Sequence, residues 1–192
     1  MENAATAPTG HGPERDDASD DAVTFLRTLG AAEIEHPGGT LLEHLQRVSR
    51  LLKAWDARRD LQLAGLCHAF YGTDGFATSL LPLESRGELV GLIGADAEEL
   101  VYFYASCDRK ASYRTLTGEG GTFRDRFTGH TFSPAPHRRR DFAELTAANE
   151  LDLAAIDPAF RTEWGDGLLG LLTRLRPLLS DEAWEHTRKV LT

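Results

Sequence analysis

The sequence is poor in cysteine and in long hydrophobic runs, and each shortage excludes a class of protein. Two cysteines in 192 residues are too few for a disulfide scaffold, and they fit a reducing cytoplasm. No apolar run approaches the roughly 18 residues that a membrane-spanning helix needs. The N-terminus lacks the basic start and the apolar stretch of a signal peptide. We therefore expect a cytoplasmic protein with no membrane partner.

Positive charge is also in short supply. The formal net charge is -9, whereas nonspecific nucleic-acid binding needs a broad basic surface. The local exception is the run from His137 to Arg140, which is too short to predict nucleic-acid binding and is interpreted as a solvated loop, with an anion contact as the alternative. We expect a small-molecule substrate and no nucleic acid. The oligomeric state is left open.

The chain divides into a tail and one domain. Residues 1–20 are rich in Ala, Pro, Gly and Asp, a composition typical of disorder. Residues 21–192 show no repeat and no long linker, so they are predicted to form a single domain. Apolar residues at helical spacing predict helices at 22–29, 41–55, 61–72, 84–93, 97–107, 141–152, 167–175 and 181–191. The Gly-rich segment 115–132 predicts a loop or small β-hairpin. The fold class is therefore all-α.

Two histidines fall within helices that must pack in the core. Thr40 and Glu43 form a capping-box pattern at the start of one helix, and His44 lies at the edge of its apolar stripe. His68 lies in the next helix, which is apolar almost all round. A buried imidazole needs partners for both ring nitrogens. A metal ion can satisfy one of them, and ordinary hydrogen bonding in the core is the alternative.

Asp108 is the candidate for a third ligand. It is predicted to end the helix AEELVYFYASCD, where a carboxylate opposes the helix dipole. A compensating cation is then expected. A bound metal would supply that charge, and so would the neighbouring Arg109 or Lys110.

Residues 36–115 resemble the HD-domain metalloproteins. The strings that carry the resemblance are GGTLLEHLQRVSRLLKAW and LQLAGLCHAFYGTD. His44 matches the first histidine of the family, His68 matches the histidine of the His-Asp pair, and Asp108 in ASCDRK matches the final aspartate. The resemblance implies an HD-like helical bundle in which these three residues bind a metal.

One departure from the family decides the expected chemistry. Ala69 stands where the family has the Asp of the pair, a residue that bridges two metals in dinuclear members. Two histidines and one carboxylate match the triad of non-haem Fe(II) oxygenases. We therefore expect a mononuclear Fe(II) oxidoreductase, or oxygenase, acting on a small polar, anionic substrate, with Mn(II) or another divalent metal as the alternative. A metal-dependent phosphohydrolase and a non-catalytic, metal-free binding module remain open.

Several further residues are candidates for substrate binding, because they are placed near the predicted ligands and suit an anion. They are His36, Arg47, Tyr71, Lys110, Tyr113 and Arg114. The Gly-rich segment is a possible lid. His130 and His137, which lie in and after it, have no assigned role.

Overall fold

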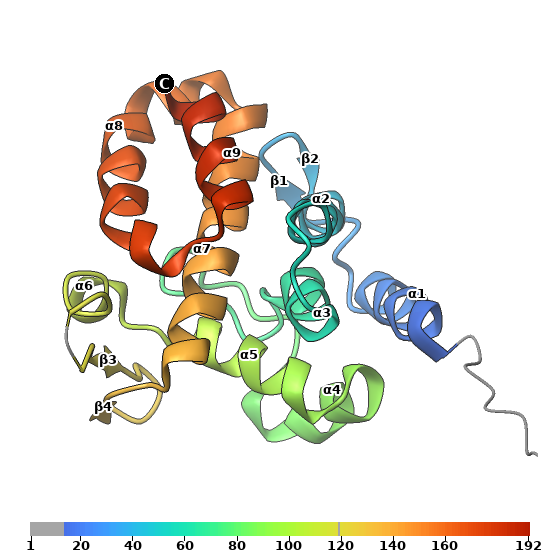
Figure 1. Cartoon of the computed structure of the whole chain (residues 1–192). Helices are drawn as coiled ribbons and strands as arrows, with labels where there is room; N and C mark the ends of the chain where they lie inside the picture. The colour runs from blue at the N-terminus through green and yellow to red at the C-terminus, as the bar shows by residue number, and fades with distance from the viewer. Residues whose placement is uncertain (1–13, 119) are drawn as a thin grey trace, which may run out of the picture.

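The chain is described by a computed structural model that covers residues 14–118 and 120–192 (Figure 1). Helices dominate this part of the chain, which confirms the all-α prediction. Their bounds are α1 (Glu14–Thr28), α2 (Leu41–Ala54), α3 (Arg59–Cys67), α4 (Arg86–Ile93), α5 (Ala95–Ala105), α6 (Arg109–Ser112), α7 (Pro136–Ile156), α8 (Pro158–Leu175) and α9 (Asp181–Leu191), with short 3-10 turns at Leu83–Ser85 and Arg176–Leu178.

Two short antiparallel hairpins accompany the helices. In the first, β1 (Glu35–His36) pairs with β2 (Gly39–Thr40) directly before α2. Gly39 is needed in this turn because its φ of 135° is one that residues with a side chain rarely adopt. In the second, β3 (Phe123–Arg124) pairs with β4 (Thr131–Phe132), so the Gly-rich segment contains the small hairpin that the sequence allows.

Helix α7 is the centre of the molecule and packs against α2, α3, α5, α8 and α9 (Figure 1). Leu145, Ala148 and Leu151 are almost completely buried along it. Pro136 and Pro158 occupy the first turns of α7 and α8. Proline suits that position because the first N–H groups of a helix have no partner within the helix. Both helices therefore begin earlier than the sequence predicts.

Close packing of α2 against α3 brings the two predicted histidines together. The capping box of Thr40 and Glu43 is present and starts α2 at Leu41. A Cβ atom on Gly65 of α3 would lie 2.5 Å from Leu52 Cδ1 of α2, too close for an ordinary contact. The absence of a side chain at Gly65 therefore lets the two helices approach each other.

The N-terminal boundary differs from the sequence expectation. Residues 1–13 of the predicted tail lie outside the described residues, but 14–20 belong to α1. Helix α1 contacts α3 and α4. Ala22 and Leu26 are completely buried in the core, so the predicted helix at 22–29 is docked there, and it begins earlier than its composition predicts.

Candidate functional site

A cavity of about 180 Å³ lies where α2, α3 and α7 meet beneath the β1–β2 hairpin. We call it the histidine cavity, because three histidines line it. The polar residues on its wall are His36, His44, His68, Thr73, Arg109, Asn149 and Glu150.

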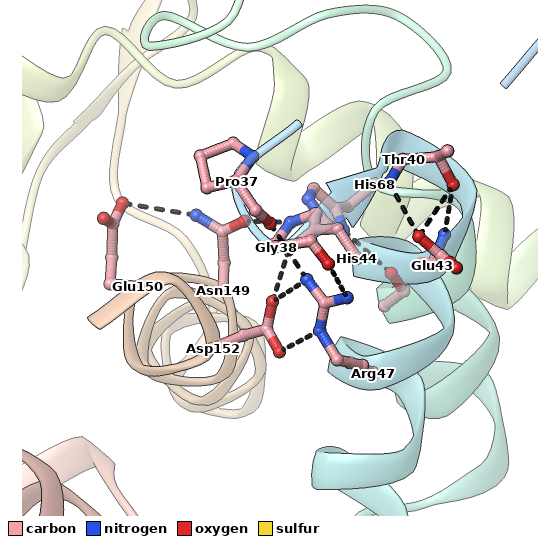
Figure 2. Close-up of polar contacts among 11 residues, drawn as sticks. Pro37, Gly38, Thr40, Glu43, His44, Arg47, His68, Asn149, Glu150 and Asp152 are labelled. Atoms are coloured by element: carbon pink, nitrogen blue, oxygen red, sulfur yellow. Dashed lines mark hydrogen bonds and ion pairs between the residues drawn. The ribbon is translucent and has the colours of Figure 1, made fainter. Parts of the chain in front are cut away.

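His44 is held by a carboxylate from α7 (Figure 2). Its Nδ1–H donates to Asp152 Oδ2 at 2.7 Å. Arg47 holds the same carboxylate from the other side, with Nε 2.8 Å from Oδ1 and Nη2 3.0 Å from Oδ2. Burial disfavours the charge of Asp152, but the hydrogen bonds from His44 and Arg47 outweigh burial and lower its pKa. The other ring nitrogen, Nε2, is on the side of Asn149, with Oδ1 of that residue 3.1 Å away.

His68 has the same arrangement with a different acceptor. Its Nδ1–H donates to the carbonyl oxygen of Gly65 at 2.8 Å, so Nε2 keeps its lone pair in the neutral ring. Burial, reinforced by the neighbouring His44, lowers the pKa of His68 to about 3. The imidazole is therefore neutral at pH 7. The rings of His44 and His68 meet edge to face, with centroids 5.4 Å apart.

His36 reaches the cavity from the hairpin. Its ring stacks on His44 with centroids 4.3 Å apart and meets the edge of Phe76 at 5.7 Å. Burial, and then the proximity of His44, lowers its pKa to about 4. Its Nδ1 is buried and has no hydrogen-bond partner within residues 14–118 and 120–192. A buried ring nitrogen without a hydrogen-bond partner can form a hydrogen bond with a ligand that enters the cavity.

The amide of Asn149 completes the polar wall. Its Oδ1 lies 3.1 Å from His44 Nε2, while its Nδ2 donates to Glu150 Oε1 at 3.3 Å (Figure 2). A carbonyl oxygen has no hydrogen to donate, so this contact needs a proton or a metal ion between the two atoms. The described residues contain no group of three or more His, Cys, Asp or Glu side chains placed to hold a metal. A metal here would therefore have two imidazoles and an amide oxygen as protein donors.

Asp108 is placed differently from the sequence expectation. Helix α5 ends at Ala105, and Asp108 instead caps the N-terminus of α6, where its side chain accepts from Ala111 N at 3.0 Å. Its other neighbour is Arg124, with Nε 3.6 Å from Oδ2. A carboxylate at a helix N-terminus is favoured by the dipole, so the predicted need for a cation disappears. Asp108 is not among the residues that line the histidine cavity.

The predicted substrate-binding residues are scattered. His36 lines the histidine cavity, and Arg47 lies behind it on Asp152. Tyr71 is almost fully buried and donates to Glu98 Oε1 at 2.8 Å. The others follow Asp108: Tyr113 lines an adjoining cavity, whereas Lys110 and Arg114 are exposed and line neither cavity.

The two histidines without an assigned role lie away from the histidine cavity. His130 is exposed and stacks on Phe132, with ring centroids 5.8 Å apart. His137 lines a separate cavity together with Arg58 and Arg138.

The sequence reasoning missed four residues that build the site. They are Arg109, Asn149, Glu150 and Asp152. Asn149, Glu150 and Asp152 lie in the buried second half of α7 and are nearly buried themselves, with exposures of 7–8%. A cluster of polar residues among Ala and Leu in the second half of this helix was the available signal, because each buried polar group needs a partner.

Comparison with known proteins gives a match to a family model over part of the chain, and a fold. The family model described as a domain of unknown function (DUF6817) matches residues 25–109. No curated protein matches the chain. The chain is similar in structure to a metazoan ortholog of SpoT that hydrolyses ppGpp and plays a role in starvation responses. The TM-score is 0.57, with 12% identity over 97% of this chain and 96% of the other. This likeness confirms the HD-like helical bundle.

No membrane-crossing helix is found in the part of the chain that the structure describes, since none there combines sufficient length with an apolar sequence.

Proposed function

We propose that the histidine cavity is the active site of a divalent-metal-dependent enzyme that acts on a small anionic molecule. His44 and His68 would hold the metal through Nε2, and Asn149 Oδ1 would be the third protein donor. Two histidines and one oxygen ligand leave positions open, as in catalytic metal sites.

The orientation of the two imidazoles carries this proposal. Each ring gives its Nδ1–H to an acceptor of the protein, Asp152 for His44 and the Gly65 carbonyl for His68. Such hydrogen bonds fix the tautomer in which Nε2 is free to bind a metal. Edge-to-face rings with centroids 5.4 Å apart suit two ligands of a single ion.

The charge of the cavity supports an anionic substrate. Arg109 pairs with Glu150, with Nη1 3.2 Å from Oε1, and Arg47 pairs with Asp152. These charges cancel, and His36 and His68 are neutral at pH 7. A divalent metal with neutral ligands would keep its two positive charges, which attract and orient an anion.

Two reaction classes use such a site. We propose Fe(II)-dependent oxidation first, because a mononuclear centre with open positions follows from Ala69 in place of the bridging aspartate. When bound, the iron would supply one-electron chemistry, while Arg109 and His36 bind and orient the substrate. Hydrolysis of a phosphate ester is the second candidate. It is supported by the likeness to a ppGpp hydrolase and by Glu150, a carboxylate on the cavity wall that is placed to accept a proton from water.

Metal content is the decisive measurement. The protein, purified without a His-tag, is reconstituted anaerobically with Fe(II), and bound iron is determined by elemental analysis. We expect about one iron per chain, lost in His44→Ala and His68→Ala. His130→Ala is the matched control, because it removes an exposed histidine outside the cavity. Equal iron in all four proteins, or none in the parent, contradicts the proposal.

The same experiment tests the third ligand and the reaction. Asn149→Ala should weaken iron binding, whereas Asp108→Ala should not if the third donor is the amide. The opposite result would restore Asp108 as the ligand. Oxygen uptake with a panel of small carboxylates and phosphates then tests oxidation, and phosphate release with Mn²⁺ tests hydrolysis. A protein that binds metal but shows neither reaction with any compound would lose its assignment as an enzyme of these two classes.

A further inference from the structure

A second cavity adjoins the histidine cavity. Its volume is about 490 Å³, and we call it the tail cavity. The two cavities share four wall residues, Gly75, Arg109, Glu150 and Phe160. The two cavities therefore border each other at these residues.

Helix α8 gives the tail cavity an apolar wall. Trp164, Leu168 and Leu171 are spaced by four and three residues, so they share one face of the helix. Trp164 is the large hydrophobic residue left exposed in the described part of the chain, with 52% of its surface accessible. An exposed tryptophan on a cavity wall provides a flat apolar surface for a ligand.

The junction between the cavities has positive charge and unused hydrogen-bonding capacity. Arg109 engages Glu150 through one amino group, and an arginine carries further N–H donors in a planar fork that fits carboxylates and phosphates. The hydroxyl group of Tyr113, which lines the tail cavity, is buried without a hydrogen-bond partner in the described residues. The guanidinium carbon of Arg109 lies 6.0 Å from the centre of the Tyr113 ring. An anion seated there would satisfy donors that the protein leaves unsatisfied.

We propose that the substrate of this site is an amphipathic anion. Its carboxylate or phosphate binds Arg109 at the junction, and an aromatic or branched aliphatic group fills the tail cavity against α8. The inference rests on the proposed function, because it describes the substrate of the same active site. It narrows the substrate class from small anions in general to those that bear an apolar group.

Binding of paired probes tests the inference. Phenylacetate is compared with acetate, and phenylphosphonate with methylphosphonate, so that the two pairs distinguish a carboxylate from a phosphate head group. Binding is measured by calorimetry and by tryptophan fluorescence, with Trp164→Phe to assign the signal to the tail cavity. We expect each phenyl compound to bind at least about tenfold more tightly than its methyl counterpart, because the ring buries apolar area. Equal affinities within both pairs would overturn the inference.

A glycine on α8 offers a way to fill the tail cavity without disturbing the fold. Gly167 lines this cavity, and a Cβ built on it meets no atom within 4 Å. Gly167→Leu should weaken phenylacetate binding about tenfold or more and leave acetate binding unchanged. Gly91→Leu is the matched control, since Gly91 is also exposed within a helix, meets no atom and lies outside the cavity. Loss of phenyl selectivity in both variants, or in neither, contradicts the inference.

Running these measurements in EDTA separates the two proposals. Arg109 and α8 do not need the metal, so the phenyl preference should persist in the metal-free protein. If the protein prefers the phenyl compounds but binds no iron, the tail cavity is a binding site for apolar groups and the proposed metal-dependent function is wrong. If iron binds and is lost in His44→Ala, but neither the iron-loaded nor the metal-free protein prefers the phenyl compounds, the proposed function stands and the amphipathic substrate is wrong.

Discussion

Asp152 on α7 and Glu98 on α5 are two buried carboxylates. Each is paired with an arginine, but they differ in the third residue that each one binds. Both carboxylates are nearly buried, with exposures of 7% and 2%. Each is held by two hydrogen bonds from an arginine, Arg47 for Asp152 and Arg86 for Glu98, at 2.7–3.0 Å. Burial of an ion pair therefore does not distinguish a functional region from a structural one.

The third partner makes the difference. Asp152 accepts from His44, whose second ring nitrogen remains at the histidine cavity. Glu98 accepts from the hydroxyl of Tyr71, which is the only polar atom of that side chain. The first network therefore ends in a group that can bind a ligand, and the second ends within the protein core. We infer that the Asp152 network positions a ligand and that the Glu98 network holds α4, α5 and the turn after α3 together.

Glu98→Ala should have the largest effect on stability. The substitution leaves the hydroxyl of Tyr71 without a partner and Arg86 without its carboxylate. We expect a loss of about 2–3 kcal/mol in the free energy of unfolding, less than for a fully buried pair because Arg86 is partly exposed. Urea unfolding followed by circular dichroism measures the loss. Iron binding in the folded variant should be unchanged. A loss under about 0.5 kcal/mol would show that this network does not hold the helices.

Asp152→Asn should weaken metal binding about 10- to 100-fold, because the amide no longer orients His44 or supports its basicity. Competition with a chelator of known affinity measures the change. Glu98→Gln is the matched control, since it makes the same change of charge in the other network and should leave metal affinity as it was. A similar loss of metal affinity in both variants would show that the two networks do not differ in their role.

The sequence predicts the parts of the site that depend on local signals. Hydrophobic spacing predicted the helix that carries His44 and the one that ends beside His68, and the capping box placed the start of α2. These are local signals, read from neighbouring residues. Asn149 and Asp152 lie more than 100 positions away from His44, so no spacing rule connects them to it. Only the packing of α7 across α2 and α3 brings these groups together.

Asp108 illustrates the other limit. The prediction depended on which end of a helix Asp108 occupies, and helix boundaries are the least certain part of a sequence prediction. Because α5 ends three residues earlier and α6 begins at Arg109, the same carboxylate changes from an unfavourable C-terminal charge to an N-cap. Tyr71 was likewise predicted from its position after His68, yet its hydroxyl turns to Glu98.

Acid should destabilise the region around the histidine cavity. The pKa of His68 is about 3 in the folded protein and 6.5 in a solvent-exposed reference. Below pH 6.5 the unfolded chain binds a proton that the folded chain does not, so stability falls as the pH drops from 6.5 towards 3. For the metal-free protein in EDTA, we expect His68 to contribute a loss of about 2 kcal/mol between pH 7.5 and pH 5. Urea unfolding at both pH values measures this loss.

The control for the pH effect is His68→Gln, which removes the titrating ring. The variant should lose less stability between the two pH values, whatever its stability at pH 7.5. His36, with a pKa lowered to about 4, should account for part of the pH dependence that remains. Identical pH slopes in the parent and the variant would contradict a buried, neutral His68.

Tyr71→Phe should have the smallest effect on stability, and it tests whether the Glu98 network is separate from the histidine cavity. The change removes one hydroxyl and leaves Glu98 held by Arg86 at 2.7 and 2.8 Å. We therefore expect a loss of about 1 kcal/mol, the usual value for one buried hydrogen bond. Tyr102→Phe, which removes the hydroxyl that donates to Asp125 at 2.9 Å, is a control of the same chemistry at a more exposed position.

The decisive readout for Tyr71→Phe is ligand binding rather than stability. Tyr71 does not line the histidine cavity or the tail cavity, so iron affinity and phenylacetate affinity should stay within about twofold of the parent values if its role is structural. Should either affinity fall about tenfold while stability is kept, Tyr71 would be a substrate-binding residue after all. The Glu98 network would then belong to the site, and the separation of the two buried carboxylates would fail.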